Sequence, residues 1–258
     1  MNAEVKSMRP QAQEIYERVR ADAYDELRRS IGALALSGLL AGFTLGATVL
    51  AYAAARAYLD GGAGLVVGAL LYPVGYVGAI LGRSQLFTEN TLYPVIVSFE
   101  DRTCLRPTAR LWGVVLAANL LGTLLFALIA VKTAALPPSV AAKIVELGDQ
   151  AVAHTAAHTF WSAVLAGWLL ALVAWLVEST SSSLGPLVVV WVITMVVGLL
   201  SLDHSVATAV QSWGGVLDGR AGLGEALGWW GMTVLGNVLG GVFIVSVVNY
   251  GQVRAGLD

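Results

Sequence analysis

The chain has 258 residues, of which 57% are hydrophobic and only 12% are charged, and its formal net charge is −2. Soluble domains carry about 25% charged residues, so this composition excludes an ordinary soluble domain and predicts a protein embedded in a lipid bilayer. The single cysteine, Cys104, excludes an internal disulfide and a cysteine-based metal site.

The N-terminal segment, residues 1–30, carries charges of both signs. Ile15, Val19, Ala23 and Leu27 recur every four residues, which predicts an amphipathic helix. The apolar stretch that follows is a full span without a cleavage site, so the segment is not expected to be a signal peptide. We expect a cytoplasmic helix, with binding to the lipid surface as the alternative.

Six apolar segments between residues 31 and 250 are each suited to crossing a bilayer. They are 31–54, 63–82 continued by 91–99, 111–131, 157–177, 184–201 continued by 206–213, and 228–250. Residues 31–250 are therefore predicted to form one all-α transmembrane domain, and residues 251–258 a short tail.

Lysines and arginines outside these segments gather on the side that holds both termini. That side has Lys6, Arg9, Arg18, Arg20, Arg28, Arg29, Arg102, Arg106, Arg110 and Arg254, whereas the other has Arg56, Lys132, Lys143 and Arg220. The positive-inside rule then predicts a multi-pass protein of a bacterial-type cytoplasmic (inner) membrane, with both termini in the cytoplasm.

The second and fifth apolar segments are interrupted by polar stretches at matching positions. Residues 83–91 interrupt the second segment and residues 201–205 the fifth, and the apolar pattern then resumes for less than a full span. Irregular backbone at membrane depth survives only when it is buried in protein or lines a cavity. Paired broken helices of this kind point to a transport site between the two loops.

The second half of the sequence repeats the first half. Residues 37–42 recur as 162–167, residues 112–122 recur as 230–240, and residues 82–88 align with 198–204. A repeat of three spans must enter the bilayer from the opposite side the second time, so we predict two inverted three-helix repeats that move a small solute.

In this alignment Thr88 and His204 occupy equivalent places in the two loops, and Asn119 is equivalent to Asn237 in the third and sixth spans. An amide inside a span needs hydrogen-bonding partners. We therefore expect both asparagines to support the backbone of the broken helices.

The polar loops supply the candidate pore residues. An ionisable group inside a membrane is a functional hypothesis by default, and His204 could give a hydrogen bond or a proton to a passing weak-acid anion. The Thr88 hydroxyl could orient His204 and contact the solute. The bulky Leu86 and Phe87 suit a constriction. The alternatives are structural: His204 bracing the loop through Asp203 or Thr88, Thr88 capping its own loop, and ordinary core packing for Leu86 and Phe87.

Three motifs together resemble those of the formate/nitrite transporter family. They are residues 86–88, 202–207 and 236–241, and they occur here in the order of the family's second, fifth and sixth spans. The resemblance covers about residues 30–250. Residues 83–91 look closer to a little-characterised branch of the family than to its formate, nitrite or hydrosulfide channels.

The resemblance implies an aquaporin-like fold assembled as a homopentamer with one pore in each protomer. It implies passage of small monovalent weak-acid anions, such as formate or nitrite, with Thr88 and His204 as the selectivity site. Asp203 stands where the family usually has glutamate. The expected partners are the lipid bilayer, the anion and further copies of the chain, with no nucleic acid and no cofactor. No enzyme is expected, because the sequence lacks a nucleophile–base pair, a nucleotide loop and a metal cluster.

Two departures from the family bear on the solute. Glu89 follows the loop threonine, where better-known members have a small residue, and a carboxylate there repels anions unless Arg83 neutralises it or it faces away. His154 and His158 stand before the fourth span, where the family usually has a lysine that draws anions in. They could form a positive vestibule; we expect no metal site, because no cysteine or carboxylate cluster is nearby in the sequence.

The alternative functions are a channel for a neutral or cationic solute and a non-transporting membrane scaffold.

Overall fold

The computed structural model describes residues 10–255. Lys6, Arg9 and the last three residues of the predicted tail lie outside this part of the chain. The described residues form helices and connecting loops, with no strand among them.

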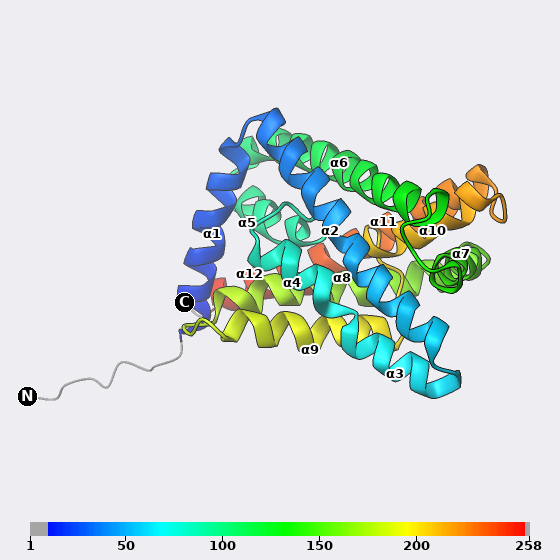
Figure 1. Cartoon of the computed structure of the whole chain (residues 1–258). Coiled ribbons are helices and arrows are strands. Elements are labelled where there is room, and N and C mark those ends of the chain that lie inside the picture. Colours follow the sequence, from blue (N-terminus) through cyan, green and yellow to red (C-terminus); the bar gives the residue numbers. More distant parts are fainter. Residues whose placement is uncertain (1–9, 256–258) are drawn as a thin grey trace, which may run out of the picture.

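The helices run as follows: α1 Ala12–Arg28, α2 Ile31–Tyr58, α3 Gly61–Leu71, α4 Pro73–Leu81, η1 Glu89–Thr91, α5 Tyr93–Glu100, η2 Arg102–Cys104, α6 Leu105–Lys132, α7 Pro138–Val152, α8 Ala156–Glu178, α9 Gly185–Leu199, α10 Ala207–Asp218, α11 Leu223–Leu239, the π-helical segment η3 Gly240–Val247, and α12 Val248–Ala255. α2 packs along α6, and α8 packs along α11. α1 stands at one end of this bundle and α7 lies at the other (Figure 1).

Within residues 10–255, five helices are long and apolar enough to cross a membrane. They are Ile31–Tyr58, Gly61–Leu81, Arg102–Lys132, Ala156–Glu178 and Leu223–Ala255. The fifth predicted segment is not among them, because α9 has only 15 residues. At about 1.5 Å per residue it is shorter than a hydrocarbon core of about 30 Å, and a loop separates it from α10. Both predicted interruptions are present, while the crossing of a bilayer as six spans stays a prediction.

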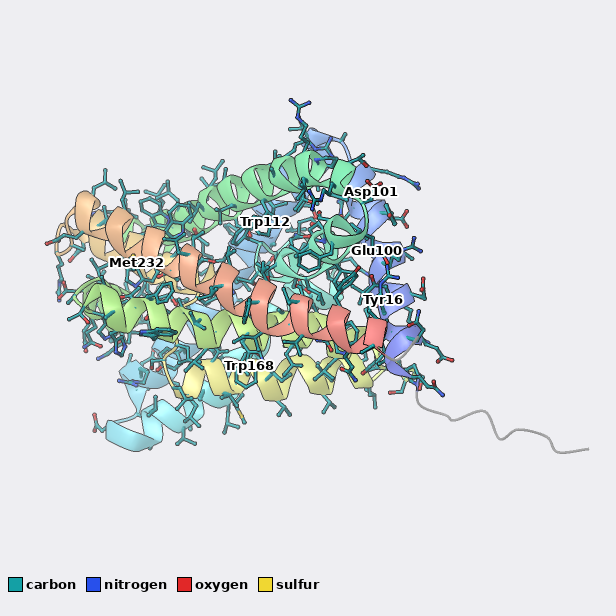
Figure 2. All side chains as sticks on the ribbon, turned by 180° about the vertical axis from the view of Figure 1, so that it is seen from behind. Tyr16, Glu100, Asp101, Trp112, Trp168 and Met232 are labelled. Carbon is teal, nitrogen blue, oxygen red and sulfur yellow. The ribbon has the colours of Figure 1, made fainter. Side chains whose placement is uncertain are left out.

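The predicted N-terminal amphipathic helix is α1, whose predicted apolar stripe of Ile15, Val19, Ala23 and Leu27 is buried. Figure 2 shows Tyr16 of this helix and Glu100, at the end of α5, at the same end of the molecule. The Tyr16 hydroxyl donates to the Glu100 carboxylate at 2.9 Å.

Asn119 on α6 ties down the first broken helix. Its Nδ2 donates to the carbonyl oxygens of Gly38 and Gln85, both at 2.8 Å, and its Oδ1 accepts from the backbone N–H of Phe87 at 2.9 Å. The bonds to Gln85 and Phe87 satisfy backbone groups that the break in the helix leaves unpaired, and the bond to Gly38 joins this loop to α2.

Asn237 on α11 makes the same three bonds in the second half. Its Nδ2 donates to the carbonyls of Ala163 and Asp203 at 2.7 and 3.1 Å, and its Oδ1 accepts from the N–H of Ser205 at 2.9 Å. The two amides therefore bond the two loops in equivalent ways.

These bonds also correct the register of the predicted repeat. They pair Gln85 with Asp203 and Phe87 with Ser205, so equivalent loop residues are 118 apart, like Asn119 and Asn237. The sequence alignment used an offset of 116 in the loops, because it matched leucines and ignored backbone bonding. The predicted equivalence of Thr88 and His204 is therefore wrong by two residues.

Candidate functional site

Thr88 and His204 meet in the centre of the protein. Both are completely buried, and Thr88 Oγ1 lies 2.9 Å from His204 Nε2. Thr88 comes from the loop between α4 and α5 and His204 from the loop between α9 and α10, so the two broken helices converge here. The edge of the Tyr76 ring packs on the imidazole, with 5.4 Å between ring centroids.

The neighbours of His204 fix its tautomer. Nδ1 accepts hydrogen bonds from the backbone N–H groups of Ala207 and Val206, at 3.0 and 3.3 Å. Because two donors point at Nδ1, this nitrogen is the acceptor and Nε2 carries the hydrogen. His204 therefore donates from Nε2 to Thr88 Oγ1.

The Thr88 hydroxyl is left with a free hydrogen. A hydroxyl has one hydrogen to donate and lone pairs that accept, and here the oxygen accepts from His204. Over residues 10–255 no protein acceptor takes the hydroxyl hydrogen, since the Thr91 hydroxyl and N–H, at 2.7 and 3.4 Å, both bond the Thr88 carbonyl and not its hydroxyl. The pair can therefore offer a donor to a small molecule.

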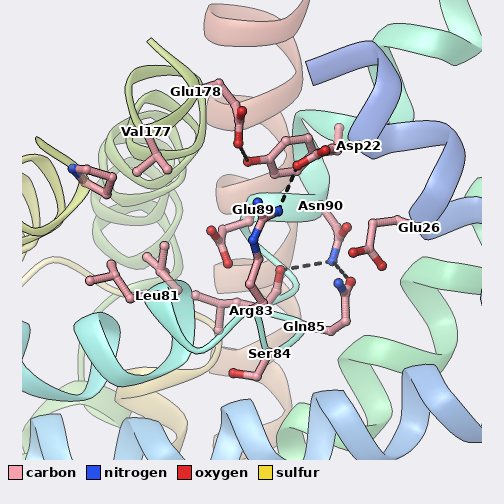
Figure 3. Close-up of a pocket in the computed structure, with 14 residues that line it drawn as sticks. Asp22, Glu26, Leu81, Arg83, Ser84, Gln85, Glu89, Asn90, Val177 and Glu178 are labelled. Carbon is pink, nitrogen blue, oxygen red and sulfur yellow. Dashed lines mark hydrogen bonds and ion pairs between the residues drawn. The ribbon is translucent and has the colours of Figure 1, made fainter. Parts of the chain in front are cut away.

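A cavity lies on each side of this pair. The first, which we name the α1-side vestibule, has a volume of about 220 Å³ and is shown in Figure 3. Its lining is Asp22, Glu26, Ile80, Leu81, Arg83, Ser84, Gln85, Leu86, Glu89, Asn90, Tyr93, Val177, Glu178 and Pro186. Neither Thr88 nor His204 reaches this cavity, so the pair is closed off from it.

The second cavity, which we name the α7-side vestibule, has a volume of about 150 Å³. It is lined by Tyr52, Arg56, Tyr72, Leu147, Gln150, Ala151, His154, Gly198, Ser201, Leu202, Asp203, Thr208 and Gln211. The hydroxyl of Thr208, one of these lining residues, accepts from the backbone N–H of His204 at 3.1 Å. The lining of this cavity is therefore bonded directly to a member of the buried pair.

The two predicted constriction residues lie in different surroundings. Leu86 lines the α1-side vestibule directly beside the buried pair. Phe87 lines neither vestibule; its ring packs edge-on against Trp112, with 5.8 Å between centroids. The Leu86 and Phe87 side chains both belong to the same buried core cluster, so they differ in whether they line a vestibule, and their role as a constriction stays a prediction. Leu202 closes the α7-side vestibule, and the sequence alignment had matched it to Leu86 without giving it a role.

The α1-side vestibule is acidic. The carboxylates of Asp22, Glu26, Glu89 and Glu178 line it, with Arg83 as the one cation in its lining. Arg83 pairs with Asp22 at 2.9 Å, and among the described residues no ion pair neutralises Glu89. Of the two conditions under which Glu89 would not repel anions, an ion pair with Arg83 is not formed, because Arg83 pairs with Asp22 of α1 (Figure 3).

His154 and His158 lie at the rim of the α7-side vestibule. Both are exposed, and their ring centroids are 4.2 Å apart. The structure brings Asp203 to them, so that ligand atoms of all three residues lie within 4.8 Å of one another. Sequence reasoning missed this carboxylate because it lies on another loop, far along the chain.

Known proteins with similar sequences are membrane proteins and transporters. A family model described as formate/nitrite transporter matches residues 13–251. The inner membrane protein YfdC of Escherichia coli (strain K12) is 30% identical over 247 residues, which cover 94% of this chain and 79% of YfdC. A probable formate transporter of Methanothermobacter thermautotrophicus is 27% identical, over 84% of this chain and 83% of that protein.

Solved structures share the fold at lower identity. An FNT family ion channel superposes with a TM-score of 0.82 at 19% identity, over 92% of this chain and 98% of that one. A pentameric formate channel with formate bound gives a TM-score of 0.71 at 18% identity, over 91% and 98%. The match over nearly the whole sequence and the shared all-helical fold lead to one conclusion: the chain belongs to the formate/nitrite transporter family, whose members are membrane channels and transporters rather than enzymes.

Proposed function

We propose that this protein is a channel for small monovalent weak-acid anions, such as formate or nitrite, which pass the Thr88–His204 pair between the two vestibules. The observation that carries the proposal is the buried hydrogen bond of 2.9 Å between these two side chains. The relative described as a probable formate transporter and the neighbour solved with formate bound support this class of solute.

The direction of the hydrogen bonds favours an anion. His204 Nδ1 is occupied by two backbone donors, so the chain of bonds runs from His204 Nε2 through Thr88 Oγ1 to the free hydroxyl hydrogen. Binding of a cation would require free lone pairs on Thr88 Oγ1, and one of these already accepts the hydrogen bond from His204. A hydrogen-bond donor in a buried site suits a carboxylate or nitrite oxygen, because a hydrogen bond to a charged acceptor is stronger than one to a neutral acceptor.

The same geometry distinguishes passive from proton-coupled passage. His204 can give up the Nε2 hydrogen only if Nδ1 gains one, and this requires breaking its bonds with Val206 and Ala207. Proton-coupled passage through His204 therefore requires the loop before α10 to move. Passive passage of the anion leaves these bonds in place.

The proposal includes an assembly and a location. The neighbour described as pentameric supports a homopentamer with one pore in each protomer, and the inner membrane relative supports an inner-membrane location. We propose residues 1–30 as a cytoplasmic helix that covers the channel domain of residues 31–250, and residues 251–258 as a cytoplasmic tail.

A channel for a small neutral or cationic solute is the second candidate. The acidic lining of the α1-side vestibule favours it. Asp22 and Glu26 are paired with Arg83 and Arg29, whereas Glu89 and Glu178 have no ion-pair partner among the described residues, and such carboxylates attract cations and repel anions when they are ionised. Under this alternative, Glu89 would be the residue next to the pore that selects against anions.

The test is stopped-flow uptake of formate, nitrite and a neutral control into proteoliposomes. Uptake is compared at about pH 5.5 and about pH 7.5, on either side of the range of a free imidazole. Thr88→Val should lower anion uptake at least about tenfold, because a bond to a charged group contributes about 1.5–3 kcal/mol. Thr233→Val is the matched control, since this buried hydroxyl bonds only within its own helix, to the Trp229 carbonyl at 2.9 Å, and should leave uptake unchanged.

His204→Asn completes the comparison. Anion uptake that falls in both pore variants supports the proposal. Uptake of the neutral solute but of neither anion, with the protein folded and oligomeric, would favour the second candidate. No uptake of any solute would favour a membrane scaffold.

A further inference from the structure

We propose that His154, His158 and Asp203 bind a divalent transition-metal ion of the zinc type at the rim of the α7-side vestibule. His154 lies in the turn between α7 and α8, His158 in the first turn of α8, and Asp203 in the loop between α9 and α10. Ligand atoms of all three lie within 4.8 Å of one another. Both imidazoles are exposed, so side-chain rotation alone can bring their nitrogens to the distance of about 2.0–2.1 Å that zinc requires.

The carboxylate of Asp203 supplies the second observation. Its side chain is 1% exposed. Oδ1 accepts from the Trp229 indole N–H at 3.0 Å, whereas Oδ2 is buried without a hydrogen-bond partner among the described residues. A buried acceptor with no partner costs about 1–3 kcal/mol, and more when it is charged. A metal ion held by the two histidines would satisfy this oxygen.

The surroundings of the carboxylate are those of a metal ligand. The Trp229 bond holds it in one orientation, as outer partners of metal ligands commonly do. No salt bridge in the described part of the chain involves Asp203; the nearby Arg56 directs its guanidinium toward the Tyr52 hydroxyl, at 3.4 Å. The negative charge is therefore left for another cation.

The donor set selects the class of metal. Two imidazole nitrogens and one carboxylate oxygen suit zinc and its neighbours, which leave a fourth position for water at such sites. Magnesium and calcium prefer sites made of oxygen alone. His154 and Asp203 both line the α7-side vestibule, so the bound ion would place positive charge where solute meets the protein.

The test measures zinc binding and does not depend on transport, so its result is independent of the proposed function. Zinc binding to the purified full chain in detergent is followed by calorimetry and by competition with a chromophoric chelator, with magnesium as the comparison ion. We expect one zinc ion per chain and no magnesium. X-ray absorption at the zinc edge should show two imidazole ligands.

Three variants decide the assignment. His158→Ala, on the exposed surface, and Asp203→Asn, which keeps an oxygen for Trp229, should each weaken zinc binding by about 100-fold or more, since even outer partners of metal ligands contribute 10–100-fold. Glu17→Gln removes an exposed carboxylate on α1, at the other end of the molecule, and should bind zinc as the wild type does. Zinc binding at the level of a detergent blank, or binding that survives His158→Ala, would overturn the proposal.

Discussion

At the scale of single residues, hydrogen-bond direction decides more about the pore than residue type does. A buried histidine could serve as an acid, a base or a hydrogen-bond donor. His204 is limited to donation in this state because the N–H groups of Val206 and Ala207 both point at Nδ1. The sequence identifies His204 and Thr88 as candidates, but it does not show which atom donates the hydrogen bond and which accepts it.

Glu89 is the residue that separates the two candidate functions. It lines the acidic vestibule without an ion-pair partner among the residues described. If the solute is an anion, Glu89→Gln removes a carboxyl group that repels anions whenever it is ionised, so uptake of formate should stay equal or rise. Stopped-flow uptake measures this, with the exposed Glu225→Gln as the control. A collapse of anion uptake in Glu89→Gln would argue against the anion channel.

The two buried amides should be important for stability. Asn119→Ala leaves the N–H of Phe87 and the carbonyl of Gln85, both in the broken segment, without their partner. We expect a loss of about 2–4 kcal/mol in the free energy of unfolding, because each buried unpaired group costs about 1–3 kcal/mol. Thermal unfolding in detergent checks this.

Asn249→Ala is the matched control for that experiment. Its amide makes one bond, to the Val245 carbonyl one turn away on the same helix, and it is only partly buried. It should change stability little. Equal losses in the two variants would mean that the bonds of Asn119 to the broken helix contribute nothing of their own.

At the scale of helices, close packing between α8 and α11 depends on the absence of a side chain at one position. A Cβ atom on Gly167 would overlap the backbone of Asn237, whereas Gly231, on α11, has no atom within 4 Å of the place its Cβ would take. Small residues at such contacts let membrane helices approach closely.

A pair of alanine substitutions tests this contact. Gly167→Ala should lower the melting temperature, with a cost of about 1–3 kcal/mol from overpacking against backbone that cannot rotate away. Gly231→Ala should be neutral or stabilising, because alanine is the better helix former by about 1 kcal/mol. A Gly167→Ala variant as stable as the wild type would contradict the close approach.

The docking of α1 is centred on Glu100. Its carboxylate accepts from Tyr16 at 2.9 Å, from Arg20 at 2.8 Å and from Arg254 at 2.9 Å. Burial and the neighbouring Glu100 raise the pKa of Tyr16 above its ordinary value. The contribution of Tyr16 to docking is therefore complete below the ordinary tyrosine pKa of about 10 and is lost as the pH rises beyond it.

Glu100→Gln should loosen α1 without unfolding the bundle. It weakens three bonds that join α1, α5 and α12, so limited proteolysis should cut near α1 faster than in the wild type. Glu17→Gln is the control, since Glu17 pairs with Arg20 at 3.5 Å on the exposed face, where a salt bridge contributes only about 0–1 kcal/mol. Identical cleavage of Glu100→Gln and wild type would show that the apolar stripe of α1 alone holds the helix.

At the scale of the whole molecule, an internal repeat places two similar loops around one centre, yet the centre is not symmetric. The asparagines, their backbone partners in the two loops and the left-handed residues Arg83 and Ser201 repeat at an offset of 118. Thr88 and His204 do not. The repeated groups build the frame, and the unmatched groups occupy the space between the two halves, where a single solute path needs one donor pair.

The two ends of the molecule also differ in charge. The α1-side vestibule gathers carboxylates from α1, η1 and α8, whereas the α7-side vestibule is bordered by Arg56 and by the cluster of His154, His158 and Asp203. Under the proposed function we expect ions to enter unequally from the two sides, because fields within a narrow cavity act strongly on ions.

The sequence by itself determined the membrane class, the α1 stripe, the two broken helices, the amides that hold them and the family. These features are local: they follow from hydropathy, periodicity and short motifs, which neighbouring residues carry along the chain. Tertiary structure alone decided which side chains meet across the halves. It set an offset of 118 residues between equivalent positions of the two loops and left Phe87 outside both vestibules. It also paired Arg83 with Asp22 and brought Asp203 close to the two histidines. Such contacts join residues far apart in sequence, and their geometry depends on how the helices pack.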